Sequence, residues 1–105
     1  MELGGKAAFV TGGSGDIGGA IARSLAKAGV DVAVSYVSDS QRAGATVEAV
    51  KKIGRRSIGV QLDQRDSNSV DTSVKKVMAE FGRLDILVNN AGWNIGIPFR
   101  DLNAL

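Results

Sequence analysis

The chain has 105 residues, of which 44% are hydrophobic and 23% are charged, and its formal net charge is +2. This length corresponds to a single domain, residues 1–105, with one modest core, and the low net charge argues against a disordered chain. The absence of cysteine and histidine excludes a disulfide scaffold, a zinc site built on those ligands and Ser-His-Asp chemistry.

The sequence also limits the partners that we expect. No apolar run approaches the roughly 18 residues of a membrane-spanning helix, and the N-terminus lacks the basic and apolar regions of a signal peptide. Acidic and basic residues are interspersed, which argues against a nucleic-acid-binding stripe. We therefore expect a cytoplasmic protein that binds neither membrane nor nucleic acid, and we predict no metal site.

The first strand and helix are predicted between residues 6 and 29. Residues 6–11 (KAAFVT) form a short apolar run, which is typical of a buried strand. A helix follows because apolar and small residues recur at helical spacing, and Gly29 ends it. The predicted buried face of this helix consists of Ile17, Ala20, Ile21, Ser24, Leu25 and Ala28.

A second strand and helix are predicted between residues 31 and 54. Residues 31–36 (DVAVSY) are rich in β-branched side chains, which favours a strand. The Ser-Asp-Ser run at 38–40 offers a helix N-cap, and Gly54 closes the helix. Its buried face carries Ala43, Val47 and Val50.

The pattern then repeats once more. Residues 57–62 predict a third strand, Asp66 or Ser67 caps a third helix that ends at Gly82, and residues 84–88 (LDILV) predict a fourth strand. The predicted face of the third helix carries Val70, Val74, Val77, Met78 and Phe81.

The resulting βαβαβαβ order indicates an α/β fold with a Rossmann-like, doubly wound parallel sheet. Right-handed crossovers place the first two helices on one face and the third on the other, so the predicted strand order is 3-2-1-4. Ligands bind such sheets at the switch point, outside the carboxyl ends of strands 1 and 4. The loops at 11–19 and 89–92 both fall there.

The first of these loops is rich in glycine. Residues 11–19 (TGGSGDIGG) join a strand to a helix, where glycines permit a tight turn and the helix N-terminus attracts a phosphate. The alternative is a glycine-rich turn that binds no ligand. Asp16 lies close to where a phosphate would bind, and we favour a helix-capping carboxylate that points outward over a functional one.

These residues resemble the short-chain dehydrogenase/reductase family. The family pattern Thr-Gly-x-x-x-Gly-x-Gly matches at Thr11, Gly12 and Gly18, whereas its middle glycine is replaced by Asp16. Residues 89–92 (NNAG), directly after a strand, match a second and more specific family motif. The chain is most similar to the 3-oxoacyl-carrier-protein reductases and the sugar-dehydrogenase-like members, and it is truncated relative to them.

The resemblance implies a nicotinamide cofactor. Asp63 would hydrogen-bond the adenine amino group, although it is alternatively a plain turn residue. NADP(H) is favoured over NAD(H), because Tyr36 and not a carboxylate ends the second strand, with Ser38, Ser40 and Arg42 nearby as donors. Alternatively, Tyr36 is an ordinary strand-end aromatic. The implied cofactor-binding residues are Gly12, Ser14, Gly15, Asp16, Ile17, Gly18, Tyr36, Ser38, Asp63, Gln64, Asn90, Ala91 and Gly92.

The family's catalytic Ser and its Tyr-x-x-x-Lys pair have no counterpart here, because the single tyrosine, Tyr36, is followed four residues later by Ser40. We therefore assign no catalytic residue, and we expect the cofactor-binding part of an NAD(P)-dependent oxidoreductase that acts on a small molecule in its full-length form. An inactive nucleotide-binding module and a structural fragment are the alternatives. The exposed edge of strand 84–88 predicts self-association.

One basic cluster lies outside these motifs. Lys51, Lys52, Arg55 and Arg56 stand at and just after the end of the second predicted helix. Cations favour a helix C-terminus and solvent, so we interpret the cluster as a solvated surface.

Overall fold

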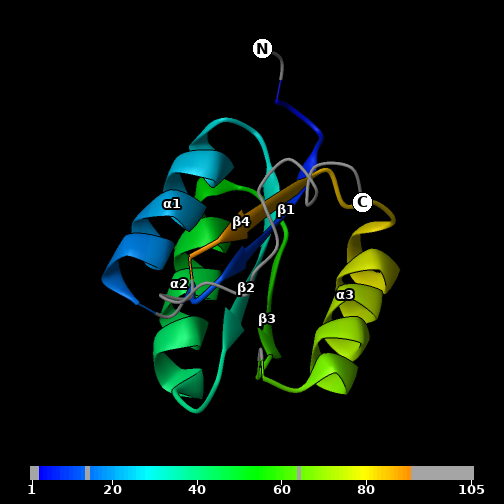
Figure 1. The fold of residues 1–105 in the computed structure, drawn as a ribbon. Coiled ribbons are helices and arrows are strands. Elements are labelled where there is room, and N and C mark those ends of the chain that lie inside the picture. The colour runs from blue at the N-terminus through cyan, green and yellow to red at the C-terminus, as the bar shows by residue number, and fades with distance from the viewer. Residues whose placement is uncertain (1–2, 14, 64, 91–105) are drawn as a thin grey trace.

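The computed structural model describes residues 3–13, 15–63 and 65–90 of the chain. Within these residues, strands and helices alternate, and all strand pairs are parallel in the order β3-β2-β1-β4 (Figure 1). The fold class and the strand order predicted from the sequence are both confirmed. The elements are β1 (Ala7–Thr11), α1 (Asp16–Lys27), β2 (Asp31–Tyr36), α2 (Ser40–Ile53), β3 (Ser57–Gln61), α3 (Ser67–Phe81) and β4 (Ile86–Asn89).

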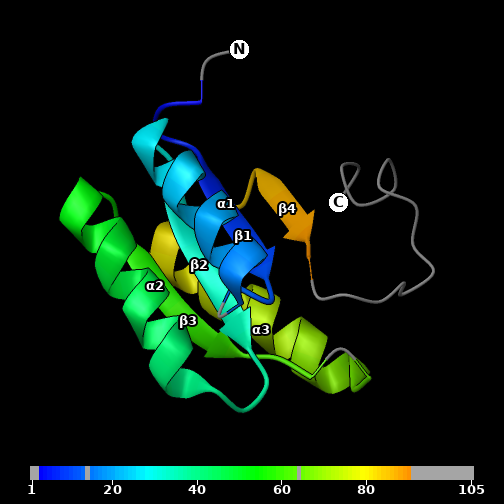
Figure 2. The same cartoon turned by 90° about the vertical axis from the view of Figure 1, so that its left-hand side faces the viewer.

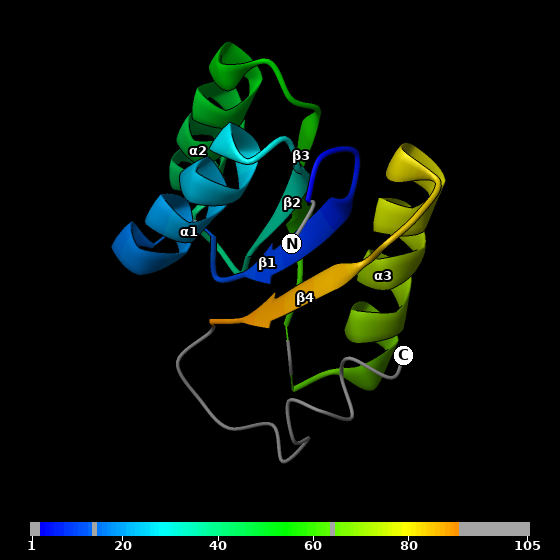
Figure 3. The ribbon, with the colours of Figure 1, turned by 90° about the horizontal axis from the view of Figure 1, so that it is seen from above.

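The sheet lies between two helical layers. Helices α1 and α2 cover one face and α3 covers the other, as Figures 2 and 3 show from two directions. Successive strand residues point to opposite faces, so β1 sends Ala8 and Val10 towards α1 and α2, and Ala7 and Phe9 towards α3. The central strands β1 and β2 are therefore buried on both sides, which explains their continuous apolar sequence.

The helix ends follow the predicted signals. The Asp39 carboxylate caps α2 and the Asp66 carboxylate caps α3, whereas Gly54 and Gly82 end those helices in the left-handed region. Strand β4 begins two residues later than predicted. At Asp85 the backbone N–H still donates to the Ala7 carbonyl oxygen, but the Ala7 N–H donates to the Asp85 side chain and not to a backbone carbonyl, both at 2.9 Å.

The residues that recur at helical spacing in α1 are not the ones that the helix buries most fully. The residues that α1 buries are Gly18, Gly19, Ala22 and Ala26, whereas Ile17 is 70% exposed. The helix approaches the sheet and the glycine loop so closely that larger side chains do not fit between them. Ile21 and Leu25 lie on the flank, partly buried.

The face predicted for α3 is correct only in part. Val77 and Phe81 are buried and Val74 packs beside them, but Val70 is 38% and Met78 is 43% exposed. These two side chains lie at the margin of the helix face that touches the sheet. The faces predicted for α2 are all buried.

The basic cluster also differs from its predicted role. Lys51 and Lys52 are exposed as expected, but Arg55 and Arg56 bind Asp31, whose side chain is only 5% exposed, at 3.0 and 2.8 Å. Burial opposes ionisation of Asp31, yet the Arg56 hydrogen bonds and the two positive charges outweigh it, so the pKa of Asp31 is lowered. Both arginines therefore stabilise the fold.

Arg56 also joins the two layers. Its guanidinium lies 5.3 Å from the centre of the Phe81 ring and donates to the carbonyl oxygens of Glu80 and Phe81 at the end of α3.

In the described part of the chain, no helix is long and apolar enough to cross a bilayer. The same residues contain no cluster of three or more carboxylate, histidine or cysteine ligands that could hold a metal.

Candidate functional site

The carboxyl ends of β1 and β4 lie side by side, where the two sequence motifs were expected to meet. Thr11 is the register partner of Asn89. Its hydroxyl lies 3.2 Å from the Val88 carbonyl oxygen and 3.3 Å from Asn89 Oδ1, and it accepts the Asn90 N–H at 3.0 Å. Thr11 therefore holds the start of the motif at 89–92 next to the start of the glycine loop at 11–19.

The glycine loop is held from β2 and α2. Gly12 has a φ of +70°, a conformation that favours glycine, and its N–H donates to Ser35 Oγ at 2.9 Å. The Thr46 hydroxyl of α2 donates to the Gly13 carbonyl oxygen at 3.0 Å. A Cβ on Gly13 would lie 2.4 Å from the Cβ of Val34, so the loop lies directly on the sheet.

Gly18 marks the point where α1 approaches both motifs. A Cβ on this residue would lie 2.3 Å from the Gly12 carbonyl oxygen and 2.8 Å from Asn90 Nδ2. Only glycine fits there without movement of the backbone. Gly15 differs, because a Cβ on it would meet nothing closer than the Gly12 oxygen at 3.6 Å. The predicted convergence of the two loops is therefore real at Gly12, Gly18 and Asn90.

The N-terminus of α1 is suited to an anion. Asp39 and Asp66 each accept a backbone N–H in the first turn of α2 and α3, but the N-cap of α1 is Gly15, and no side chain caps this helix within the described residues. Its first N–H groups consequently face outward with the positive end of the helix dipole. A phosphate group fits this position.

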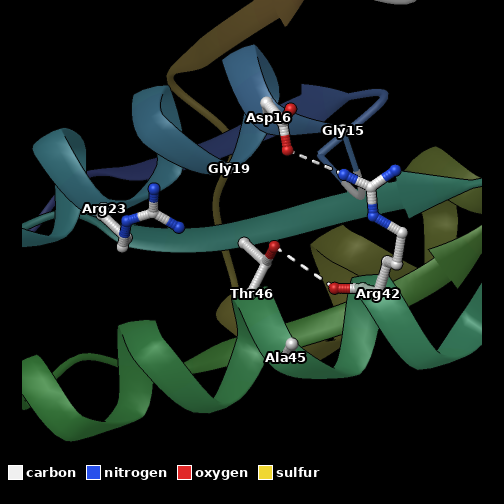
Figure 4. Close-up of a pocket in the computed structure, with 7 residues that line it drawn as sticks. All are labelled: Gly15, Asp16, Gly19, Arg23, Arg42, Ala45 and Thr46. Carbon is white, nitrogen blue, oxygen red and sulfur yellow. Dashed lines mark hydrogen bonds and ion pairs between the residues drawn. The ribbon is translucent and has the colours of Figure 1, made fainter.

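Asp16 points away from that N-terminus. Its side chain is 97% exposed and its Oδ1 accepts a hydrogen bond from Arg42 Nη2 at 2.8 Å (Figure 4). The outward orientation agrees with the favoured prediction, although the carboxylate makes no capping hydrogen bond. Asp16 thus forms an ion pair between the first turns of α1 and α2.

A cleft of about 450 Å³ lies beneath this ion pair. Figure 4 shows the side chains that enter it from the two helices, among them Arg23 from α1 and Thr46 from α2. Sequence reasoning missed both of these residues. The available signal was their spacing, since Arg23 stands one turn after Gly19 and Thr46 one turn after Arg42. The lining residues are Gly15 at the N-cap of α1, Asp16, Gly19 and Arg23 of α1, and Arg42, Ala45 and Thr46 of α2.

At the end of β2, Tyr36 behaves as a strand-end aromatic. It is half-buried against the core under α1 and α2, and its ring carbon Cε1 would lie 3.7 Å from a Cβ on Gly59. Ser38 is exposed in the turn that follows, and its carbonyl oxygen accepts the Ser40 N–H. The ring therefore covers the sheet, while the serines face solvent.

At the end of β3, Asp63 is already engaged by a neighbour. Both of its carboxylate oxygens accept hydrogen bonds from the Arg65 side chain at 3.1 Å, and its N–H donates to Ser69 Oγ at 3.0 Å. The Arg65 hydrogen bonds lower the pKa of Asp63, which keeps the carboxylate ionised as an acceptor. Any further ligand of Asp63 shares it with Arg65.

Of the remaining residues predicted to bind the cofactor, the structure describes only Ile17. Ile17 is exposed on the flank of α1, next to Asp16. Four positions lie outside the described residues, namely Ser14, Gln64, Ala91 and Gly92.

Comparisons with known proteins agree with this geometry. The model of the short chain dehydrogenase family matches residues 6–104. The chain is 45% identical over 87 residues to a 3-oxoacyl-[acyl-carrier-protein] reductase of Staphylococcus aureus, covering 83% of this chain and 35% of that protein. The chain therefore spans about a third of the length of this curated relative.

Two solved structures are similar over most of the chain. A short chain dehydrogenase from Burkholderia cenocepacia in complex with NADP has a TM-score of 0.83 and 44% identity, covering 99% of this chain and 44% of that one. An NAD⁺-bound xylitol dehydrogenase has a TM-score of 0.83 and 30% identity, covering 89% of this chain and 35% of that one.

Proposed function

Because the chain belongs to the short-chain dehydrogenase family, we propose that it is the cofactor-binding part of an NAD(P)-dependent oxidoreductase. The observation that carries this proposal is the meeting of Gly12, Gly18 and Asn90 at the uncapped N-terminus of α1. Bound nicotinamide would donate a hydride to a carbonyl carbon of a small-molecule substrate when reduced, or accept one from a hydroxyl-bearing carbon when oxidised.

The residues fit a dinucleotide. The backbone of Gly12 and the N–H groups at the start of α1 receive the pyrophosphate, since a side chain at Gly18 would fill the space that lets these segments meet. Asp63 accepts a hydrogen bond from the adenine amino group while it keeps Arg65. Further contacts come from Ser14, Gly15, Asp16, Ile17, Tyr36, Ser38, Gln64, Asn90, Ala91 and Gly92.

Within this proposal, NADP(H) is the preferred cofactor. No carboxylate ends β2 at Tyr36, so none repels a phosphate on the adenosine ribose. Two arginines, Arg23 and Arg42, line the adjoining cleft. The Burkholderia relative in complex with NADP supports this choice. The NAD⁺-bound xylitol dehydrogenase keeps NAD(H) as the alternative.

Titration of the purified protein at its full natural length with NADPH and NADH, followed by calorimetry, tests the proposal. We expect saturable binding that favours NADPH. The variant Gly18→Val should lose binding, because its side chain enters the space between the Gly12 carbonyl and Asn90. Gly44→Ala in α2 is the matched control, since a Cβ at this exposed position would meet nothing within 4 Å and Gly44 is not among the proposed contacts. Failure of the folded wild type to bind either dinucleotide contradicts the proposal.

These 105 residues lack the catalytic pair that the family resemblance implies. The only tyrosine, Tyr36, has Ser40 and not lysine four positions later, so a Tyr-x-x-x-Lys acid is missing from the chain. This observation favours a second candidate function, a nucleotide-binding module without catalysis. Reduction of ketones by NADPH in the presence of the 105-residue chain alone would exclude that module, and its absence together with cofactor binding would support it.

We also propose that copies of the chain associate through β4 in the cytoplasm, where proteins fold without disulfides. β4 pairs with β1 along one edge, and no described strand lies along the other. The half-buried Ile86, Leu87 and Val88 make this edge apolar. Sedimentation velocity of the 105-residue chain should show concentration-dependent dimers, whereas a monomer at every concentration contradicts the proposal.

A further inference from the structure

The ion pair between Asp16 and Arg42 lies at the entrance of the α1–α2 cleft. The two charged groups are 2.8 Å apart, and their side chains are 97% and 55% exposed. Both residues stand in the first turn or immediately after the start of their helices, where Figure 4 shows them reaching across the gap. Because the pair is exposed, it is weak and exchangeable.

A second guanidinium, that of the exposed Arg23, lines the same cleft. Arg23 Nη1 would be 3.3 Å from a Cβ on Gly19, so the missing side chain leaves room for this group. Arg23 has no ion pair with any described residue. The cleft thus holds two positive charges and one negative charge, and its remaining charge favours an anion.

The position of Arg42 relates this charge to the nucleotide. Helix α2 begins four residues after β2 ends, so Arg42 stands beside the strand end at which the adenosine ribose lies in folds of this type. Asp16 stands at the N-terminus of α1, beside the proposed pyrophosphate position. The ion pair therefore spans the two places where phosphate groups of a phosphorylated dinucleotide would lie.

Resting on the function proposed above, we propose that Asp16 determines cofactor specificity by competing with the ribose phosphate for Arg42. A phosphomonoester carries nearly two negative charges and binds a guanidinium with two parallel hydrogen bonds, so it displaces the single carboxylate. Displaced Asp16 then stands unpaired near the phosphate and repels it. Asp16 consequently weakens NADPH binding more than NADH binding.

The test is a cycle of variants in the full-length protein, with dissociation constants for NADPH and NADH measured by calorimetry. The readout is the preference, defined as the NADH constant divided by the NADPH constant. Asp16→Asn should raise the preference about threefold to fivefold, the range of an exposed ion pair. Arg42→Gln should lower it about tenfold, as expected for a lost charged hydrogen bond.

Coupling between the two residues provides the sharper result. In the Arg42→Gln background, Asp16→Asn should change the preference less than about twofold, because the competition no longer exists. Arg23→Gln is the matched control: it removes a positive charge from the same cleft without touching the ion pair, and should lower the preference less than Arg42→Gln does. Asp16→Gly is a second variant that removes the carboxylate, and thermal unfolding of each variant shows whether it is folded.

Three outcomes would overturn this inference. They are an unchanged preference in both Asp16 variants, equal losses in Arg42→Gln and Arg23→Gln, and an Asp16 effect that persists in full without Arg42. In each of these cases NADH binding still supports the proposed function. Loss of binding of both dinucleotides by the folded wild type would instead overturn the proposed function and this inference together.

Discussion

Asn90 Nδ2 lies 2.8 Å from the point that a Cβ on Gly18 would occupy, although the two residues belong to motifs at opposite ends of the described chain. The same point is 2.3 Å from the Gly12 carbonyl oxygen, so backbone and side chain both close around it. The loop after β1, the start of α1 and the end of β4 can therefore approach one another this closely only because Gly18 has no side chain.

The first prediction concerns this contact. Gly18→Ala should lower the free energy of unfolding by about 3 kcal/mol, because the Gly12 carbonyl must move away from the added methyl group. Gly15→Ala, at the open N-cap, should cost less than about 1 kcal/mol. Urea unfolding of both variants checks this difference. Equal losses would show that helix propensity, and not the close approach, dominates.

A second prediction tests the anchor of the glycine loop. Thr46→Val keeps the shape of a buried side chain but removes the O–H that the Gly13 carbonyl accepts at 3.0 Å. Leaving this carbonyl unpaired should cost about 1–2 kcal/mol, measured by urea unfolding. Thr72→Val on the exposed surface of α3 is the control and should have almost no effect. A neutral Thr46→Val would mean that the loop holds its position without α2.

The third prediction separates two neighbouring arginines. Arg56→Gln should lose about 2 kcal/mol of stability, since Arg56 binds Asp31 and also the carbonyls at the end of α3. Arg55→Gln should lose less, because within the described residues Arg55 forms an ion pair with Asp31 alone. Thermal unfolding of the two variants ranks them. The reverse ranking would refute a bridging role for Arg56.

The fourth prediction concerns acid. Hydrogen bonds from Arg83 and from the Ala7 N–H lower the pKa of Asp85 from 3.8 to about 2. A carboxyl whose pKa is lower in the folded state stabilises the fold above its unfolded pKa, and this contribution is lost as the pH falls from about 4 to about 2. In Asp85→Asn, the free energy of unfolding should therefore fall less steeply over that range.

The measurement is urea unfolding at several pH values between 2 and 6, for wild type and Asp85→Asn. Asp71→Asn is the control, because its ion pair with Lys75 is exposed at both ends and contributes little. Parallel pH curves for wild type and Asp85→Asn would contradict a lowered pKa at Asp85.

The topology was predictable because glycines and capping carboxylates mark the ends of the helices in the sequence itself. Asp39, Asp66, Gly54 and Gly82 are found where the pattern predicts a cap. The right-handed crossover rule then leaves one strand order. The meeting of the two motifs at Gly18 and Asn90 follows from that order alone, without knowledge of any side-chain contact.

The buried face of α1 was not predictable from hydrophobic spacing. Periodicity ranks residues by apolarity, so it selects Ile17 over Gly18, whereas the distance between helix and sheet admits only the smaller residue. Long-range polar contacts were missed for a different reason. Asp31 begins β2 and Arg56 directly precedes β3, 25 positions later, so no local sequence pattern indicates that the two side chains form a hydrogen bond.

The ion pairs of Asp31 and Asp85 both stand where strands begin, whereas the glycine loop and the cleft stand where strands end. One end of the sheet thus carries the ion pairs that stabilise the fold, and the opposite end carries the proposed cofactor site. Substitutions at Arg55, Arg56 and Arg83 should therefore change tolerance to heat and acid without altering the residues of the proposed cofactor site. Stability and cofactor preference should therefore respond to different sets of substitutions.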